Sequence, residues 1–151
     1  MGSSRTRHYR ASHGVDEWIT GFDRGLRTLT GTHQAARPNP AKDVAEADLT
    51  AQERSHVAGL MRVNHTGEVC AQALYEGQAL MASDTNAKAS LMSAAAEEQD
   101  HLVWCRSRLR ELDSRPSLLD PVFFGLSFAL GAAAGLMGDR VSLGFVEATE
   151  D

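Results

Sequence analysis

The chain has 151 residues, a formal net charge of −5 and two cysteines, Cys70 and Cys105. The length suffices for one domain with its own core, the acidic balance argues against nucleic acid as a partner, and two distant cysteines fit a reduced cytosolic protein without a disulfide framework. Ala, Leu, Glu and Arg are common and strand-like alternation is nearly absent, so we predict an all-α protein.

The N-terminal third contains three segments. Residues 1–14 are rich in Arg and Ser and lack acidic residues, and we expect a disordered basic N-terminus. Apolar residues recur at helical spacing in residues 15–30, which predicts an amphipathic helix. This helix packs on the body of the protein or lies on a membrane surface, and the pattern favours neither. Residues 31–48, with Pro38 and Pro40, are predicted to be a linker.

A capping box at Thr50 and Glu53 predicts the start of a long helix. Further along this helix, Glu68 stands where the apolar stripe requires a hydrophobic residue. Gly67 weakens the helix and suggests that another backbone approaches closely there. His65 lies on the same side, three residues before Glu68, and is either a metal ligand or a core histidine with a polar partner. The second interpretation is the more common one.

The next predicted helix carries a Glu-x-x-His pair, Glu98 and His101, and ends near Leu112. Residues three apart lie on one helix face, so one metal ion can bind both side chains. The pair falls within the apolar stripe, where an unpaired carboxylate is costly to bury and a metal ion would relieve the cost. The alternative is a helix with a partly hydrated charged patch. Cys105 shares this stripe, and we expect a small buried hydrophobe there rather than a ligand.

Residues 121–138 contain no charged side chain. We interpret this run as an apolar segment that packs in the bundle and also touches lipid, in preference to a transmembrane helix, because its length is minimal for a span. Asp139 can cap one more helix, with Glu147 and Glu150 near its inner side.

A lone Glu on one helix and a Glu-x-x-His pair on the next form half of the ligand set of di-iron carboxylate proteins, which are helical bundles. Glu147 or Glu150 can supply a third element, and the spacing does not choose between them. No second Glu-x-x-His follows in these 151 residues.

The chain resembles the demethoxyubiquinone hydroxylase family of ubiquinone biosynthesis in its bacterial form. The residues that carry the resemblance lie in four blocks, at positions 59–75, 97–101, 114–117 and 143–151. The resemblance implies a ferritin-like antiparallel helix bundle that holds two iron ions. It also implies that the iron ligands are Glu68, Glu98, His101 and Glu150, with Glu150 favoured over Glu147.

The resemblance further implies a mono-oxygenase. Two ferrous ions reduce O₂, the co-substrate, and the ring of demethoxyubiquinol, an isoprenoid quinol, is hydroxylated. We expect the protein to be a peripheral protein on the cytoplasmic side of the bacterial cell membrane. Its partners would be the membrane surface and either further copies of the chain or other proteins of ubiquinone biosynthesis.

The family's second Glu-x-x-His has no counterpart here, so we expect residues 49–151 to form an incomplete bundle that lacks part of the site. Without the last helix, Leu91, Leu102 and Leu109 should be partly exposed. Two alternatives remain: a ferritin-like iron-binding half-bundle that completes its site by dimerisation, and a non-catalytic, membrane-associated helical remnant. The number of irons per chain and the oligomeric state separate the hydroxylase from the half-bundle.

Overall fold

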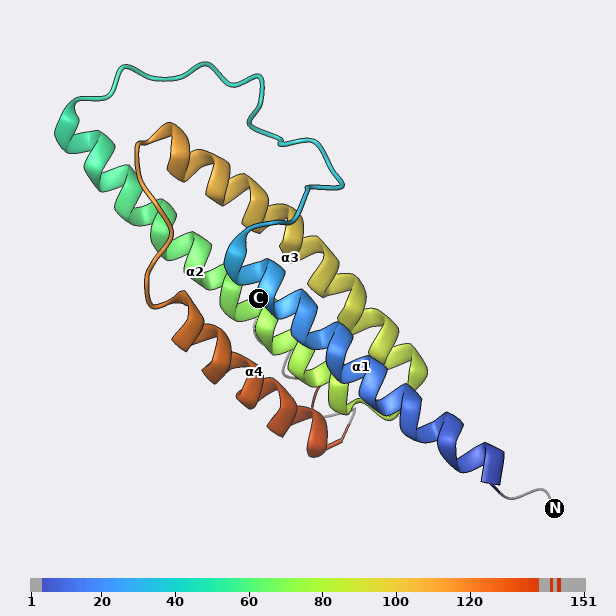
Figure 1. Ribbon diagram of the computed structural model, residues 1–151. Coiled ribbons are helices and arrows are strands. Elements are labelled where there is room, and N and C mark those ends of the chain that lie inside the picture. The colour runs from blue at the N-terminus through green and yellow to red at the C-terminus, as the bar shows by residue number, and fades with distance from the viewer. Residues whose placement is uncertain (1–3, 139–141, 143, 145–151) are drawn as a thin grey trace.

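The computed structural model describes residues 4–138, 142 and 144, with side chains from residue 15 onward except those of residues 17 and 18. This part of the chain forms four helices and no strand: α1 (Ser4–Thr30), α2 (Ala51–Met81), α3 (Thr85–Glu111) and α4 (Asp120–Leu136). Figure 1 shows α2 between α3 and α4, with α1 running alongside them in front of α2. The predicted all-α class is confirmed, and the arrangement is consistent with a helical ferritin-like bundle.

Helix α1 is longer than the sequence pattern indicated, because it begins at Ser4 rather than near residue 15. The backbone of residues 4–14 is helical in the structure, whereas the sequence pattern predicted a disordered basic N-terminus. No proline precedes Pro38, and Arg and Ala are good helix formers, so the helix continues past the point where its amphipathic pattern starts. Its N-terminal turns project beyond the other helices (Figure 1).

The C-terminal end of α1 is fixed by local geometry and by α3. Gly31 adopts a φ of 73°, a conformation that favours glycine, and its N–H donates to the Arg27 carbonyl. A side chain on Gly31 would collide with the guanidinium of Arg106. That guanidinium donates to the Thr28 carbonyl at 3.0 Å. Arg106 thus caps α1 and holds it against α3.

Helix α2 starts at the predicted capping box. The Thr50 hydroxyl accepts from the Glu53 N–H, and the Glu53 carboxylate accepts from the Thr50 N–H at 2.8 Å. The side chain of Asp84 caps α3 by accepting from the N–H groups of Asn86 and Ala87. Because the loop between α2 and α3 is short, the two helices run antiparallel (Figure 1). Their facing sides form a core cluster of Leu74, Tyr75, Ala79, Leu91 and Ala95.

Three glycines allow α2 and α4 to pack with their backbones in close approach. A Cβ on Gly77 would lie 2.3 Å from the Phe128 carbonyl oxygen, and one on Gly131 would lie 2.2 Å from the Leu74 carbonyl oxygen. Gly135 also abuts α2. The close approach expected at Gly67 is wrong, because nothing lies within 4 Å of a Cβ built there.

The expectation that Leu91, Leu102 and Leu109 are exposed is also wrong, since 3% or less of each remains accessible. Leu91 packs in the core cluster between α2 and α3. Leu102 lines a small cavity together with Thr28, Gly31 and His33, so the end of α1 and the segment after it cover this part of α3.

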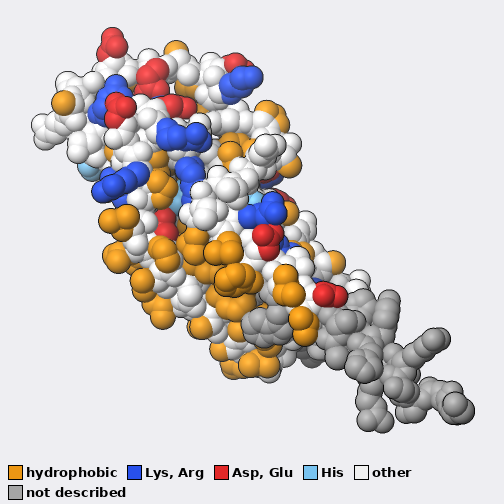
Figure 2. Space-filling model, in the orientation of Figure 1, with side chains coloured by type: hydrophobic (Ala, Val, Ile, Leu, Met, Phe, Trp, Pro, Cys, Tyr) orange, Lys and Arg blue, Asp and Glu red, His pale blue; other side chains and the backbone are white. Residues whose placement is uncertain are grey.

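The exposed apolar side chains lie instead mainly on α1 and α4. They include Ile19, Phe22 and Leu26 of α1, and Val122, Leu126 and Leu130 of α4. Figure 2 shows apolar side chains gathered on the side of the molecule where these two helices lie. One side of α4 packs on α2, as predicted for the charge-free run. Among the described residues, no helix combines the length and apolar character that crossing a bilayer requires.

Candidate metal centre

Glu68 of α2 and the pair Glu98 and His101 of α3 meet at the interface of these two helices. Each residue offers one ligand atom that lies within 4.8 Å of those of the other two. His101 Nδ1 is 3.1 Å from Glu98 Oε2 and 3.7 Å from Glu68 Oε2. The three side chains thus converge across two antiparallel helices, as half of a shared metal site requires.

The local sequence explains how α3 presents its two groups. Glu98 and His101 lie one helical turn apart on one face, and Leu102 and Ala95 bury the adjoining face of the helix. The ring of Trp104 lies 5.3 Å from the His101 ring, and the Arg37 guanidinium lies 5.6 Å from the Trp104 ring. The segment that follows α1 therefore packs beside the histidine and restricts its orientation.

Residue Arg37 is itself held by Asp100, which is almost fully buried. The Arg37 Nε donates to Asp100 Oδ2 at 2.6 Å, and the Ala36 N–H donates to Oδ1 at the same distance. Burial opposes ionisation of Asp100, but these hydrogen bonds prevail and lower the pKa of its carboxyl below the usual value. Asp100 therefore acts as an anchor for the segment between α1 and α2.

The electrostatics of the three side chains favour a bound cation. The pKa of Glu68 is raised to about 8. Burial is the largest cause, and the neighbouring Glu98 carboxyl is the next. Two carboxylates at this interface resist being ionised together because each disfavours the charge of the other. A divalent cation would compensate both charges, so the donor set fits a metal ion.

Among the described residues, the cluster of potential ligands includes neither cysteine. Burial, followed by the charge of Glu68, raises the pKa of Cys105 to about 11. Its thiol therefore stays protonated near neutral pH in the metal-free protein. Cys105 is half-buried rather than buried as expected, and it lies outside the cluster.

His65 is a core histidine, as the more common interpretation held. It is fully buried, its Nδ1 lies 3.1 Å from Asp120 Oδ2, and its Nε2 accepts from Arg106 Nε at 3.3 Å. Burial and then the positive charge of Arg106 lower its pKa, so the ring is neutral. The Thr66 hydroxyl also donates to Asp120, at 2.7 Å. His65 and Thr66 therefore tie α2 to the start of α4.

The sequence analysis missed two buried polar residues on α2, Gln72 and Glu76, which are 0% and 4% exposed. They follow Glu68 at intervals of four residues, so a search for polar residues at helical spacing would have found them. Glu147 and Glu150 lie outside the described residues, as does the Asp139 cap.

Comparisons with known proteins identify relatives of this chain. The family model described as "Ubiquinone biosynthesis protein COQ7" matches residues 55–151. A 3-demethoxyubiquinol 3-hydroxylase of Burkholderia cenocepacia is 58% identical over 137 residues, which are 90% of this chain and 66% of the relative. A protein of the same name from Acinetobacter baylyi is 58% identical over 145 residues, covering 95% of this chain and 67% of the relative.

A third relative of that name, from Pseudomonas aeruginosa, is 54% identical over 149 residues, covering 98% of this chain and 68% of its own length. The chain thus spans about two thirds of the length of these curated relatives. No solved structure matches it significantly.

Proposed function

The chain belongs to the COQ7 family of ubiquinone biosynthesis proteins, and we propose that it contributes Glu68, Glu98 and His101 to an iron centre that hydroxylates the ring of demethoxyubiquinol. The observation that carries this proposal is the convergence of two carboxylates and one imidazole on facing helices. The substrate is the one named for the relatives, which are 3-demethoxyubiquinol 3-hydroxylases.

The donor set suits iron. Oxygen and imidazole ligands without a thiolate are typical of iron sites in helical bundles, whereas thiolates favour zinc or iron–sulfur clusters. In the family that the chain resembles, the centre holds two irons. Besides Glu68, Glu98 and His101, this chain would supply Glu150 as a fourth ligand. Iron, when bound, provides the reduction of O₂ on which ring hydroxylation depends.

The protein's own groups prepare the site for a cation. Glu68 has a raised pKa and releases its proton when a cation binds, so both carboxylates become anionic ligands. Trp104 packs beside His101 and limits the rotation of its ring. The side chains of Glu98 and Glu68 are only 15% and 27% exposed, so little bulk water reaches them.

Binding to the membrane surface belongs to the same proposal. The substrate carries an isoprenoid tail, and α1 and α4 expose apolar side chains on one side of the molecule (Figure 2). We infer a peripheral protein on the cytoplasmic face of the bacterial membrane. Cosedimentation with phospholipid vesicles should fall in Leu126→Glu, because Leu126 is 66% exposed on α4, and should persist in the control Leu60→Glu on α2. Equal binding by both variants would remove α4 from the membrane contact.

The test of the iron centre compares Glu98→Gln with Glu97→Gln. The two residues are neighbours, but the Glu97 side chain is 60% exposed and faces solvent. Anaerobic titration with Fe²⁺ should show binding by the wild type and Glu97→Gln and a loss of at least tenfold in affinity for Glu98→Gln. Equal iron binding by all three proteins would refute the proposed ligands.

Product analysis on the same samples tests the reaction. Conversion of demethoxyubiquinol should follow iron content across the three proteins, and conversion by iron-free Glu98→Gln would contradict the proposal. Iron bound between two chains without conversion would favour the ferritin-like half-bundle. Light scattering supplies the mass that distinguishes these outcomes.

A further inference from the structure

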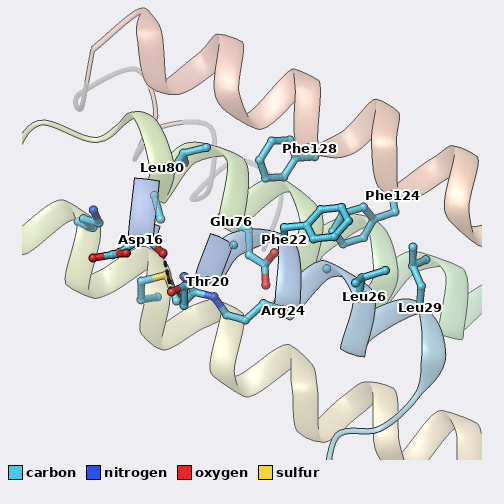
Figure 3. Close-up of a pocket in the computed structure, with 15 residues that line it drawn as sticks. Asp16, Thr20, Phe22, Arg24, Leu26, Leu29, Glu76, Leu80, Phe124 and Phe128 are labelled. Atoms are coloured by element: carbon cyan, nitrogen blue, oxygen red, sulfur yellow. Dashed lines mark hydrogen bonds between the residues drawn. The ribbon is translucent and has the colours of Figure 1, made fainter. Parts of the chain in front are cut away.

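A cavity of about 580 Å³ lies between α1, α2 and α4, and Lys88 and Met92 of α3 also line it. Most of its lining is apolar: Phe22, Leu26 and Leu29 of α1, Leu80 of α2, and Phe124 and Phe128 of α4. Figure 3 shows these side chains around the space between the helices. Its volume falls in the range of pockets that hold small organic ligands.

One wall of this apolar cavity carries the carboxylate of Glu76, which points into it (Figure 3). Glu76 is only 4% exposed. Its Oε1 accepts a hydrogen bond from Gln72 Nε2 at 2.7 Å, but its buried Oε2 has no partner among the described residues. A buried acceptor without a donor is costly, so the cavity presents an unsatisfied hydrogen-bonding position.

A matching donor lines the same cavity from another helix. Arg24 of α1 also lines the cavity, and its buried Nε has no partner in the described part of the chain, while its Nη1 donates to Met92 Sδ at 3.4 Å. Burial raises the pKa of the Glu76 carboxyl; the hydrogen bond from Gln72 and then the charge of Arg24 oppose this shift, yet no ion pair joins Arg24 and Glu76 in the described part of the chain. The cavity therefore contains one free donor and one free acceptor that do not satisfy each other.

We propose that this cavity binds an apolar molecule with a neutral hydroxyl at one end, which accepts from Arg24 Nε and donates to Glu76 Oε2. A hydroxyl is one small group that both donates and accepts. An anionic end would meet Glu76 as well as Arg24, and an ammonium would meet Arg24 as well as Glu76, so the pair favours neither charge. Asp16 and Lys88, which also line the cavity, are again one group of each sign. The aromatic and aliphatic lining accommodates the apolar part of the ligand.

This site is separate from the candidate metal centre. Glu76 lies two helical turns after Glu68 on α2, which is about 12 Å along the axis at the usual rise per residue. A head group held at Glu76 is therefore out of reach of the ligands Glu68 and Glu98. The proposal goes beyond the hydroxylation reaction, and either can fail without the other. Isoprenoid alcohols and tailed quinols both carry the required hydroxyl.

Calorimetry on iron-free protein tests the preference for a hydroxyl. The probes are farnesol, farnesoic acid and farnesylamine, which share one apolar chain and differ in the head group. Farnesol should bind at least about tenfold more tightly than either charged analogue. Equal binding of the three probes, or no binding of farnesol, would overturn the proposal. A competition experiment distinguishes the two candidate ligands, isoprenoid alcohols and tailed quinols. Displacement of farnesol by a quinol with a two-isoprene tail would identify a quinol ring as the head group.

Substitutions test the two polar partners. Glu76→Gln keeps the shape of the side chain and removes its charge. Farnesoic acid should therefore bind this variant about tenfold more tightly than it binds the wild type. Arg24→Leu should weaken farnesol binding about tenfold. Glu97→Gln, on the exposed side of α3, is the control and should bind farnesol as the wild type does. Circular dichroism confirms that each variant is folded.

Glu98→Gln separates this site from the metal centre. It should leave farnesol affinity unchanged, because Glu98 does not line the cavity. A loss of farnesol binding in Glu98→Gln would place the alcohol at the metal centre and overturn the proposal. The proposal would also be overturned if both Glu76→Gln and Arg24→Leu kept the head-group preference of the wild type.

Discussion

The contact between α2 and α4 predicts a large effect of a single methyl group. In Gly131→Ala the new Cβ would lie 2.2 Å from the Leu74 carbonyl oxygen and 3.0 Å from the Leu74 Cα, whereas ordinary contacts begin at 3.4 Å. Because the clashing atoms belong to the backbone of α2, no side chain can rotate away. The two helices must separate by roughly 1 Å, which disrupts packing along the whole interface.

The expected cost follows from two opposing effects. Alanine favours a helix over glycine by about 0.5–1 kcal/mol, and overpacking a close contact costs about 1–3 kcal/mol or more. Gly125→Ala in the same helix gains the first effect alone, since nothing lies within 4 Å of a Cβ at that position. We therefore expect the unfolding free energy of Gly131→Ala to lie about 2 kcal/mol or more below that of Gly125→Ala.

Urea unfolding followed by circular dichroism measures this difference, and the melting temperature should differ by about 4–8 °C, at about 2–4 °C per kcal/mol for a chain of this size. Gly77→Ala, whose Cβ would lie 2.3 Å from the Phe128 carbonyl oxygen, should behave like Gly131→Ala. If Gly131→Ala is as stable as Gly125→Ala, α2 and α4 do not pack with their backbones in contact.

Two further predictions concern buried carboxyl groups. Asp120→Asn should lower the unfolding free energy by about 1–3 kcal/mol, since Asp120 is buried beside His65 and accepts from Thr66, while the exposed control Asp113→Asn should cost little in the same urea assay. Because the pKa of Glu68 in the folded protein is raised from 4.5 to about 8, the folded state retains this proton more strongly than the unfolded state. The unfolding free energy of metal-free protein should thus decline from about pH 4.5 towards pH 8, and Glu68→Gln should reduce that decline while Glu97→Gln leaves it intact. Equal slopes in all three proteins would contradict this cause.

Features that depend on short stretches of sequence were predictable. The capping box at Thr50 and Glu53 is a local pattern, and it marks the observed start of α2. The Glu-x-x-His pair needed only the periodicity of a helix, and Glu68 was identified as a polar residue in an apolar stripe. The convergence of the three side chains followed because a short loop joins α2 and α3 and makes them antiparallel neighbours.

Features that depend on which helix faces meet were not predictable. Glycine at position 67 and glycine at position 77 look alike in the sequence, and only the course of α4 decides that Gly77 is the contact. The burial of Leu102 likewise depends on Arg106, which binds the end of α1 and brings the following segment over α3. The start of α1 lacks a cap or breaker, so its amphipathic pattern did not reveal where the helix begins.

One stripe of α2 concentrates groups that lower stability. Glu68, Gln72 and Glu76 follow one another at intervals of four residues on a helix packed between α3 and α4. Gln72 Oε1 and Glu76 Oε2 are buried without partners among the described residues. The pKa of Glu68 is raised, so its charged form is destabilised. Apolar side chains in these positions would stabilise the bundle. Such violations of the core pattern are expected where a protein binds ligands, so the stripe itself argues that a cation at Glu68 and a polar group at Glu76 complete it.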